Sequence, residues 1–120
     1  MRYFGKMRSV LLVEDDPTIR CLVNDVLIEE GYTVVAVEDG ARALEVLEEL
    51  RPFVILLDLY MPRVNGWQFL RTMNQRNADI PIVICSAVSI KELPRGVVGA
   101  LKKPFSLDAL VATVRPFAKS

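Results

Sequence analysis

Three acidic residues stand together at the end of an apolar run, where their mutual repulsion and their desolvation both cost free energy. The run is LLV at positions 11–13, and Glu14, Asp15 and Asp16 follow it directly. At neutral pH the least costly relief is a raised pKa or a bound hard cation. Mg²⁺ suits such a site, because it prefers oxygen ligands and usually takes one or two carboxylates together with waters and phosphate oxygens.

Other polar side chains stand at the ends of further apolar runs. Asp58 ends FVILLD, Ser86 ends PIVICS, and Lys102 and Lys103 follow VVGAL. A carboxylate can accept a phosphoryl group covalently, and phosphoryl transfer requires a metal, a fixed cation and hydrogen-bond donors. These residue types supply that chemistry if folding brings them to one crevice. An acid-dyad hydrolase is the rival interpretation, but it leaves the lysine and the serine without roles.

The composition excludes several other kinds of site. The chain has no histidine, which removes the usual general base, the histidine-activated nucleophiles and imidazole metal ligands. Cys21 and Cys85 lie outside any pairing motif, so neither a disulfide scaffold nor a zinc site is expected. The 15 basic and 15 acidic side chains cancel, and no apolar run is long enough to span a bilayer. We therefore expect a cytoplasmic protein whose partner is neither nucleic acid nor a membrane.

Short apolar runs alternate with stretches of helical periodicity, which predicts strands at 10–13, 33–37, 53–58, 81–86 and 97–101. Asp16 can cap the first helix with Pro17 as its first residue, and Gly31 ends that helix. Ser106 can cap the last helix, and Pro116 marks its end. The apolar face of the first helix is predicted to hold Ile19, Leu22, Val23, Val26 and Leu27.

Five strands with intervening helices predict a single α/β domain over residues 1–120, with an N-terminal extension at 1–8 and a core at 9–118. The sheet should be parallel, with right-handed crossovers and helices on both faces. Ligands of such folds bind at the carboxyl ends of the strands. Because the polar residues described above stand at those ends, we expect them to converge on one crevice.

The motifs LLVEDDP, ILLDLYMPRVNGWQFL, PIVICSA and KKPFSLDAL occur here in the order typical of response-regulator receiver domains, the phospho-acceptor modules of two-component signalling. The chain resembles this family over nearly its whole length. The resemblance implies a flavodoxin-like, doubly wound five-stranded parallel sheet with strand order 2-1-3-4-5 and helices on both faces. It also implies a signalling domain rather than an enzyme, with at most self-catalysed phosphorylation and dephosphorylation.

The resemblance gives the polar strand ends individual roles. Asp58 would accept the phosphoryl group, Ser86 would be the switch hydroxyl, and Lys103 would pair with Asp58 or its phosphate. The Lys103–Pro104 bond would be cis, as an X–Pro bond can be. The donor would be a phosphohistidine on a histidine kinase or a histidine phosphotransfer protein. The signal would pass to a downstream protein or a fused output domain, from a monomer or weak dimer.

The cofactor implied by the resemblance is Mg²⁺. Its ligands would be Glu14, Asp15, Asp58 and the backbone carbonyl of Tyr60. Asp15 would bind the ion directly, whereas Glu14 would act mainly through metal-bound water. Asp16 remains assigned to the helix cap.

Two departures from the family pattern concern the output surface. The family usually has Tyr or Phe three residues before the lysine, and here that position is Ala100. The segment from Ser86 to Lys103 is shorter than usual by more than one helical turn, and it contains Pro94 and Gly96. We therefore expect a shortened or irregular fourth helix, and a signal that leaves through the first helix or the loops around the site.

Alternative functions depend on particular positions. A pseudo-receiver, an interaction module without a phosphate cycle, would fit Ala100 and the shortened segment. A haloacid-dehalogenase-type phosphatase usually needs a second Asp two residues after the first, where this chain has Tyr60. A flavin-binding protein is disfavoured, because Glu14 and Asp15 would repel a phosphate unless a metal intervened.

Overall fold

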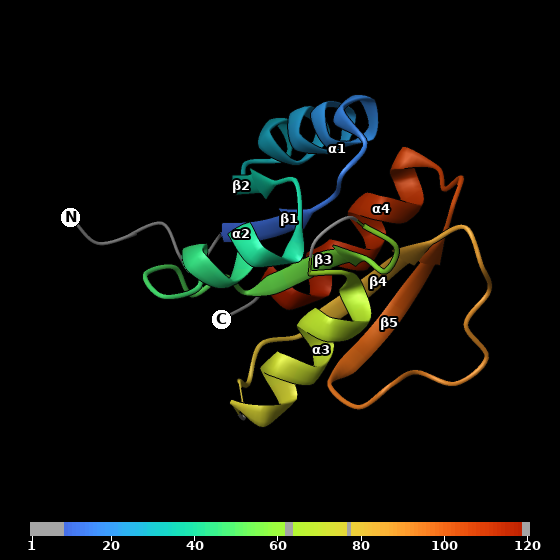
Figure 1. Ribbon diagram of the computed structural model, residues 1–120. Helices are drawn as coiled ribbons and strands as arrows, with labels where there is room; N and C mark the ends of the chain where they lie inside the picture. The colour runs from blue at the N-terminus through green and yellow to red at the C-terminus, as the bar shows by residue number, and fades with distance from the viewer. Residues whose placement is uncertain (1–8, 62–63, 77, 119–120) are drawn as a thin grey trace.

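The computed structural model describes residues 9–61, 64–76 and 78–118, and their centre is a five-stranded parallel sheet (Figure 1). The strands run in the spatial order β2-β1-β3-β4-β5, which confirms the predicted order. Their bounds are β1 (Ser9–Val13), β2 (Thr33–Val37), β3 (Val54–Asp58), β4 (Ile82–Ser86) and β5 (Val97–Lys102). The helices are α1 (Pro17–Glu29), α2 (Gly40–Val46), α3 (Gly66–Gln75), α4 (Leu107–Val114) and the 3-10 helix η2 (Arg115–Ala118).

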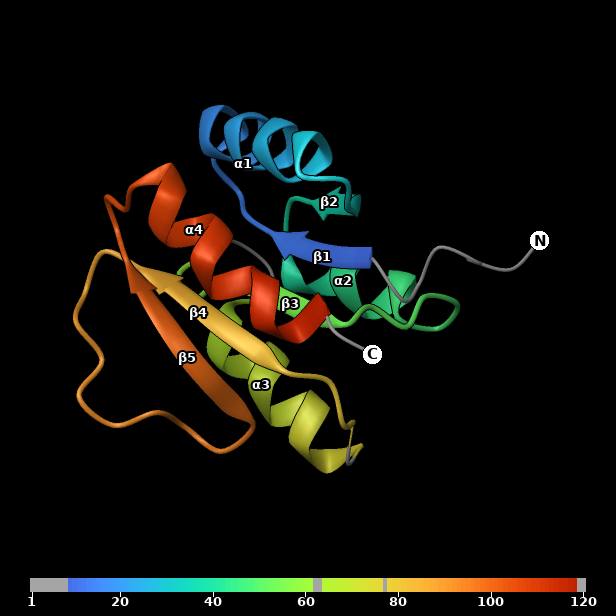
Figure 2. The same ribbon diagram turned by 180° about the vertical axis from the view of Figure 1, so that it is seen from behind.

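The interior strands are apolar because helices cover both faces of the sheet. Every residue of β1, β3 and β4 is buried, as expected for central strands of a parallel sheet. Figure 2 shows α1 and α4 over one face, and α2 and α3 lie over the other (Figure 1). Alternate residues of β3 therefore enter different cores: Leu57 packs on the α2 and α3 side, and Leu56 on the α1 and α4 side.

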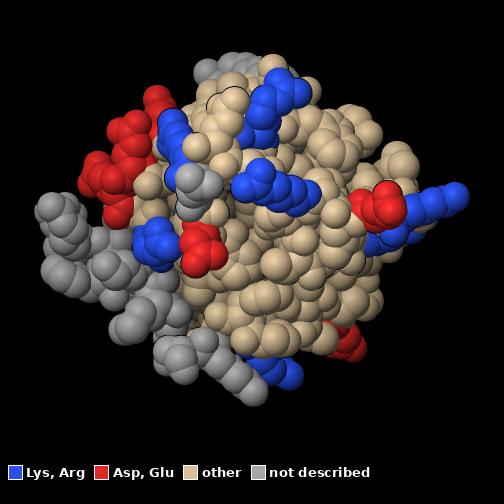
Figure 3. Space-filling view, turned by 90° about the horizontal axis from the view of Figure 1, so that it is seen from below, with Lys and Arg blue, Asp and Glu red and all other residues tan. Residues whose placement is uncertain are grey.

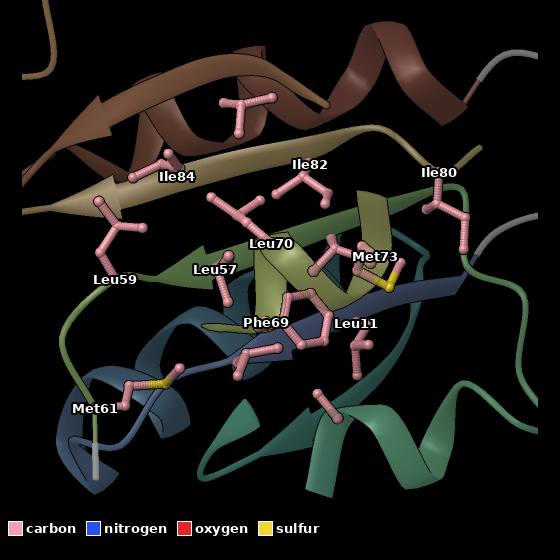
Figure 4. Close-up of a cluster of buried hydrophobic side chains, with 14 of the residues drawn as sticks. Leu11, Leu57, Leu59, Met61, Phe69, Leu70, Met73, Ile80, Ile82 and Ile84 are labelled. Carbon is pink, nitrogen blue, oxygen red and sulfur yellow. The ribbon is translucent and has the colours of Figure 1, made fainter. Parts of the chain in front are cut away.

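The core beneath α3 fixes the segment that follows β3. Phe69, Leu70 and Met73 project from one face of α3 toward Leu11 and Leu57 (Figure 4). Phe69 is completely buried. Burial of such an aromatic side chain is a large stabilising contribution, because its apolar surface is removed from water. The start of α3 is thereby held against the carboxyl end of β3.

Side-chain caps start the helices where the sequence predicted them. The Asp16 carboxylate accepts hydrogen bonds from the N–H groups of Thr18 and Ile19, at 2.8 and 3.2 Å. Ser106 caps α4 in the same way through Ala109 N–H at 3.0 Å. Gly31, with φ of 95°, follows the end of α1. These local predictions are confirmed.

The structure corrects the sequence interpretation at Leu22 and refines it after β4. The side chain of Leu22, predicted to lie on the apolar face of α1, is exposed, whereas its neighbour Val23 is buried.

Residues 87–96 form bends and turns without a helix, so the shortened segment has lost its fourth helix completely. The label α4 therefore belongs to the last helix, which continues beyond Val114 as η2. No helix in the described part of the chain has the length and apolar character of a membrane span.

The cap at Asp16 gives a first prediction. Asp16→Ala removes the acceptor for two otherwise unpaired N–H groups, and we expect it to lower the free energy of unfolding by about 1 kcal/mol. Urea denaturation followed by circular dichroism measures this change. Asp16→Asn is the matched control, because its side-chain oxygen can still cap; an equal loss in both variants would contradict the capping role.

Candidate functional site

The parallel register brings polar residues from separate parts of the chain to one edge of the sheet. Asp58 at the end of β3 is paired with Cys85 of β4, and Ser86 is paired with Lys102 of β5. Glu14 follows β1 directly, and its N–H donates to Val37 O of β2 at 3.0 Å. The polar strand ends therefore meet at one edge of the sheet, where the crevice was predicted.

Three carboxylates form the floor of this crevice. One oxygen from each of Glu14, Asp15 and Asp58 lies within 4.8 Å of the others. Glu14 and Asp58 are buried, at 2% and 7% exposed, whereas Asp15 is more accessible to solvent. Oxygen donors at this spacing are the chemistry that a hard divalent cation prefers, so the residues present fit Mg²⁺.

Lys103 supplies the positive charge inside the crevice. Its Nζ lies 2.7 Å from Glu14 Oε1 and 3.6 Å from Asp58 Oδ2. The sequence interpretation paired this lysine with Asp58, but the structure places it between the two acids and closer to Glu14. Burial by itself lowers the pKa of the ammonium, but the hydrogen bond and charge of Glu14, with the charge of Asp58, raise it overall. Lys103 is therefore a permanent cation in this site.

Asp58 is the carboxylate whose pKa is raised by its surroundings. Burial first, and the negative charge of Glu14 second, raise its pKa from 3.8 to about 6, against the opposing effect of Lys103. The N–H of Tyr60 donates to Asp58 Oδ1 at 3.3 Å and also favours the charged form. Without a cation the site therefore relieves its repulsion partly through a raised pKa, one of the two remedies predicted from the sequence.

Ser86 lies buried at the end of β4, on the side of the crevice next to β5. Its Oγ accepts a hydrogen bond from Val88 N–H at 3.1 Å, and its carbonyl accepts one from Lys103 N–H at 2.7 Å. Beside it a hollow of about 180 Å³ is lined in part by Val88, Ile90 and Ala100. Ala100 offers only a methyl group to this hollow.

Two residues that the sequence interpretation overlooked shape the site. Arg20 Nη1 donates to Glu14 O at 2.8 Å and Asp15 O at 3.3 Å, and so ties the acidic loop to α1. At Gly66 a Cβ atom would lie 2.4 Å from Leu59 Cα and 2.7 Å from Asp58 O, so only glycine allows α3 to approach the Asp58 loop this closely. The available signal for Arg20 was a basic residue one turn into the first helix. The available signal for Gly66 was the NG pair at 65–66.

The arrangement can hold a cation, accept an electrophile on Asp58 and neutralise charge through Lys103. Cys85 is no competing nucleophile, because burial raises the pKa of its thiol to about 12. The Lys103–Pro104 bond is cis, as the resemblance implied. The position of Tyr60 places its N–H at Asp58, and its ring is exposed.

Comparison with known proteins agrees with this geometry. The family model of the response regulator receiver domain matches residues 10–115. The chain belongs to this family. Receiver domains are signalling domains of two-component systems, and response regulators interact with histidine kinases.

Individual relatives share both sequence and fold with this receiver domain. Response regulator MprA of Mycobacterium ulcerans is 36% identical over 111 residues, which cover 88% of this chain and 48% of that protein. The chain thus spans about half the length of the curated relatives it matches. The Francisella response regulator 1452 receiver domain superimposes with a TM-score of 0.87 at 29% identity, covering 92% of this chain and 96% of that one.

Two of the similar solved structures hold magnesium, the response regulator TrrA from Thermotoga maritima, in complex with Mg²⁺-BeF, and a receiver domain from Pseudomonas aeruginosa. The receiver domain of the sensor histidine kinase PA1611 from Pseudomonas aeruginosa has a magnesium ion coordinated in its active site cleft. It superimposes with a TM-score of 0.84 at 28% identity, and the match covers 94% of this chain and 98% of that one.

The raised pKa of Asp58 predicts how stability depends on pH. Because the folded-state pKa of about 6 exceeds the ordinary 3.8, ionising Asp58 costs the folded state free energy that the unfolded chain does not spend. That penalty is complete above about pH 6 and vanishes below about pH 4. We expect Asp58→Asn to raise the free energy of unfolding by about 1–3 kcal/mol at pH 8 in EDTA. Urea denaturation measures this gain, which should shrink at pH 4.5.

The control for that experiment is Asp16→Asn, an equal change of charge at an exposed carboxylate. A gain for Asp58→Asn that is the same at pH 8 and pH 4.5 would contradict the assignment of the penalty to Asp58 ionisation.

Proposed function

We propose that this receiver domain accepts a phosphoryl group on Asp58 from a phosphohistidine of a histidine kinase or a histidine phosphotransfer protein. The observation that carries the proposal is the meeting of Glu14, Asp15, Asp58 and Lys103 in one crevice of a receiver fold. An Asp58 oxygen attacks phosphorus as the phosphorus–nitrogen bond to imidazole breaks, and the electron pair stays on the imidazole. The product is an aspartyl phosphate, and this chain needs no histidine of its own.

The crevice would hold Mg²⁺ through Glu14, Asp15, Asp58 and the backbone carbonyl of Tyr60. When bound, the ion supplies positive charge that offsets the phosphoryl oxygens. The close approach of the three carboxylates supports this assignment, because they repel one another without a cation. Arg20 holds the carbonyls of Glu14 and Asp15, so the acidic loop is positioned before any ligand arrives.

Lys103 is the group that can follow the change in charge at Asp58. In this structure Lys103 Nζ hydrogen-bonds to Glu14, with Asp58 less than an ångström farther away. A phosphoryl group on Asp58 would add negative charge on that side of the crevice. We infer that the ammonium then shifts its hydrogen bond from Glu14 to a phosphoryl oxygen, with little movement of the backbone.

Ser86 would pass the change to the chain beyond β4. For its hydroxyl to contact a phosphoryl oxygen, the Ser86 side chain must leave the N–H of Val88, to which it now bonds. Ala100 provides no ring to move in response, and residues 87–96 form no helix that could shift as a unit. We infer that the signal appears in the loop after Ser86. It would pass to a downstream partner or to a fused output domain.

A pseudo-receiver, an interaction module without a phosphate cycle, is the second candidate, and two observations favour it: Ala100 stands in the aromatic position, and residues 87–96 form no helix. In that function no aspartyl phosphate would form at Asp58. The two candidates differ in one covalent product, so mass spectrometry separates them.

Phosphorylation itself is the decisive prediction. Incubation with Mg²⁺ and acetyl phosphate should add roughly 80 Da, the mass of one phosphoryl group, to the intact protein. Asp58→Asn should abolish the adduct. Asp15→Ala should form little adduct, and adding Mg²⁺ should no longer increase its yield. Asp16→Ala is the matched control and should be phosphorylated normally, because Asp16 only caps α1. No adduct on the unaltered protein would favour the pseudo-receiver.

The exposed side chains beside the acceptor predict the lifetime of the phosphate. Tyr60 and Val88 are 58% and 55% exposed, and the family resemblance places these positions beside the path of attacking water. Because bulky groups there exclude water, we expect slow self-dephosphorylation. Replacing both by alanine should accelerate loss of the adduct about tenfold, a change of roughly 1.4 kcal/mol in the barrier. Time-resolved mass spectrometry after removal of acetyl phosphate measures this, and an unchanged rate would exclude the screening role.

A further inference from the structure

A cleft between α3 and the segment before β5 lies outside the acidic crevice. It is an open hollow of about 410 Å³ on the protein surface. One wall consists of residues of α3 at helical spacing, among them Trp67, Arg71 and Asn74. The other wall is the turn at 94–95. The lining of the cleft includes Trp67, Arg71, Asn74, Gln75, Pro94 and Arg95. We call this surface the α3 cleft.

The geometry of the turn fixes the shape of the α3 cleft. Asn74 Nδ2 donates a hydrogen bond to Arg95 O at 3.1 Å, which attaches the turn to α3. Gly96 has a φ of +88°, and a Cβ atom there would lie 2.8 Å from Asn74 Oδ1. Glycine is needed at position 96 for two reasons. The positive φ disfavours residues that have a side chain, and the amide of Asn74 fills the space that a Cβ atom would occupy. The missing helix after β4 is thus replaced by a turn that is fastened to α3.

The α3 cleft carries local positive charge in a chain whose net charge is zero. Arg71 and Arg95 are both exposed, and among the described residues neither guanidinium forms an ion pair. In the part of the chain that the structure describes, no acidic side chain lines the cleft. Figure 3 shows the molecule from below, with Lys and Arg side chains near the centre and at the margins, and acidic side chains at the left, at the right and at the lower right. The two guanidinium groups are therefore available to an anionic partner.

The remaining side chains favour a peptide over other anions. Trp67 is 40% exposed and offers an aromatic surface next to the arginines. Asn74 and Gln75 bring side-chain amides, which can pair with peptide N–H and C=O groups. Arginine binds carboxylates with two parallel hydrogen bonds, and exposed aromatic and arginine side chains are typical of protein interfaces. Nucleic acid instead requires a broader positive surface than two arginines provide.

We propose that the α3 cleft binds an acidic peptide segment of a partner protein, with Arg71 and Arg95 on its carboxylates and Trp67 against its apolar atoms. This interaction surface lies apart from the crevice of Asp58 and needs no phosphoryl group. It gives the receiver domain a contact surface on α3, in addition to the loop after Ser86.

The test uses the unphosphorylated protein and a defined probe. A hexaglutamate peptide is titrated while the fluorescence of Trp67, the single tryptophan of the chain, is followed at low salt. We expect saturable binding that weakens as salt is added, because the contacts are ionic. Hexaglutamine should not bind. The double substitution Arg71→Glu with Arg95→Glu should weaken binding about tenfold or more, as expected when charge-assisted hydrogen bonds are replaced by repulsion.

The double substitution Arg51→Glu with Arg115→Glu is the matched control, because it makes the same change of charge at two exposed arginines outside the α3 cleft. Binding that this control weakens as much as the substitutions at Arg71 and Arg95 would overturn the proposal, since it would reflect overall charge alone. A single-stranded oligonucleotide that binds more tightly than the peptide and is lost in the double variant would reassign the cleft to nucleic acid. Self-association in sedimentation that the double variant abolishes would reassign it to an interface between copies of this chain. No fluorescence change up to about 1 mM peptide would also overturn it.

Discussion

The site depends on the burial of two carboxylates, Glu14 and Asp58, beside the partly buried ammonium group of Lys103. Two acids this close repel each other, and neither can be removed from water without compensation. Lys103 compensates Glu14 more directly than Asp58. Burial of Asp58 first, and the charge of Glu14 second, raise the pKa of Asp58 to about 6. Of the two buried acids, Asp58 therefore would gain more from a cation.

This balance of charges is possible only because the strands are parallel. Positions 14, 58, 86 and 103 are distant in sequence, but each follows or ends a strand that points in the same direction. Helices on both faces bury the strands. Because the core is close-packed, the strand ends have little freedom to move. Gly66 and Arg20 then hold the connecting loops close to the carboxylates through backbone contacts. The fold therefore positions the charged groups before any ligand binds.

The sequence interpretation succeeded where one repeating signal dominated and failed where a single contact decided the outcome. Buried strands and capped helices were located because apolar runs and cap residues act locally. The periodicity placed Leu22 on the buried face of α1, but the structure leaves it half exposed, because it borders an open hollow together with Ala87 and Leu107 instead of a packed neighbour. Arg20 was overlooked because a side chain that binds two backbone carbonyls leaves no periodic pattern.

The sequence by itself determined the parallel α/β fold, the strand ends that carry the polar groups, and the absence of histidine chemistry. Those features follow from hydrophobic periodicity and residue type, which act over a few positions. Only the tertiary structure decided that Lys103 bonds to Glu14 more closely than to Asp58, and that residues 87–96 form a turn attached to α3 through Asn74. Such choices depend on differences of about an ångström between groups far apart in the chain, because electrostatic and hydrogen-bond energies change steeply with distance.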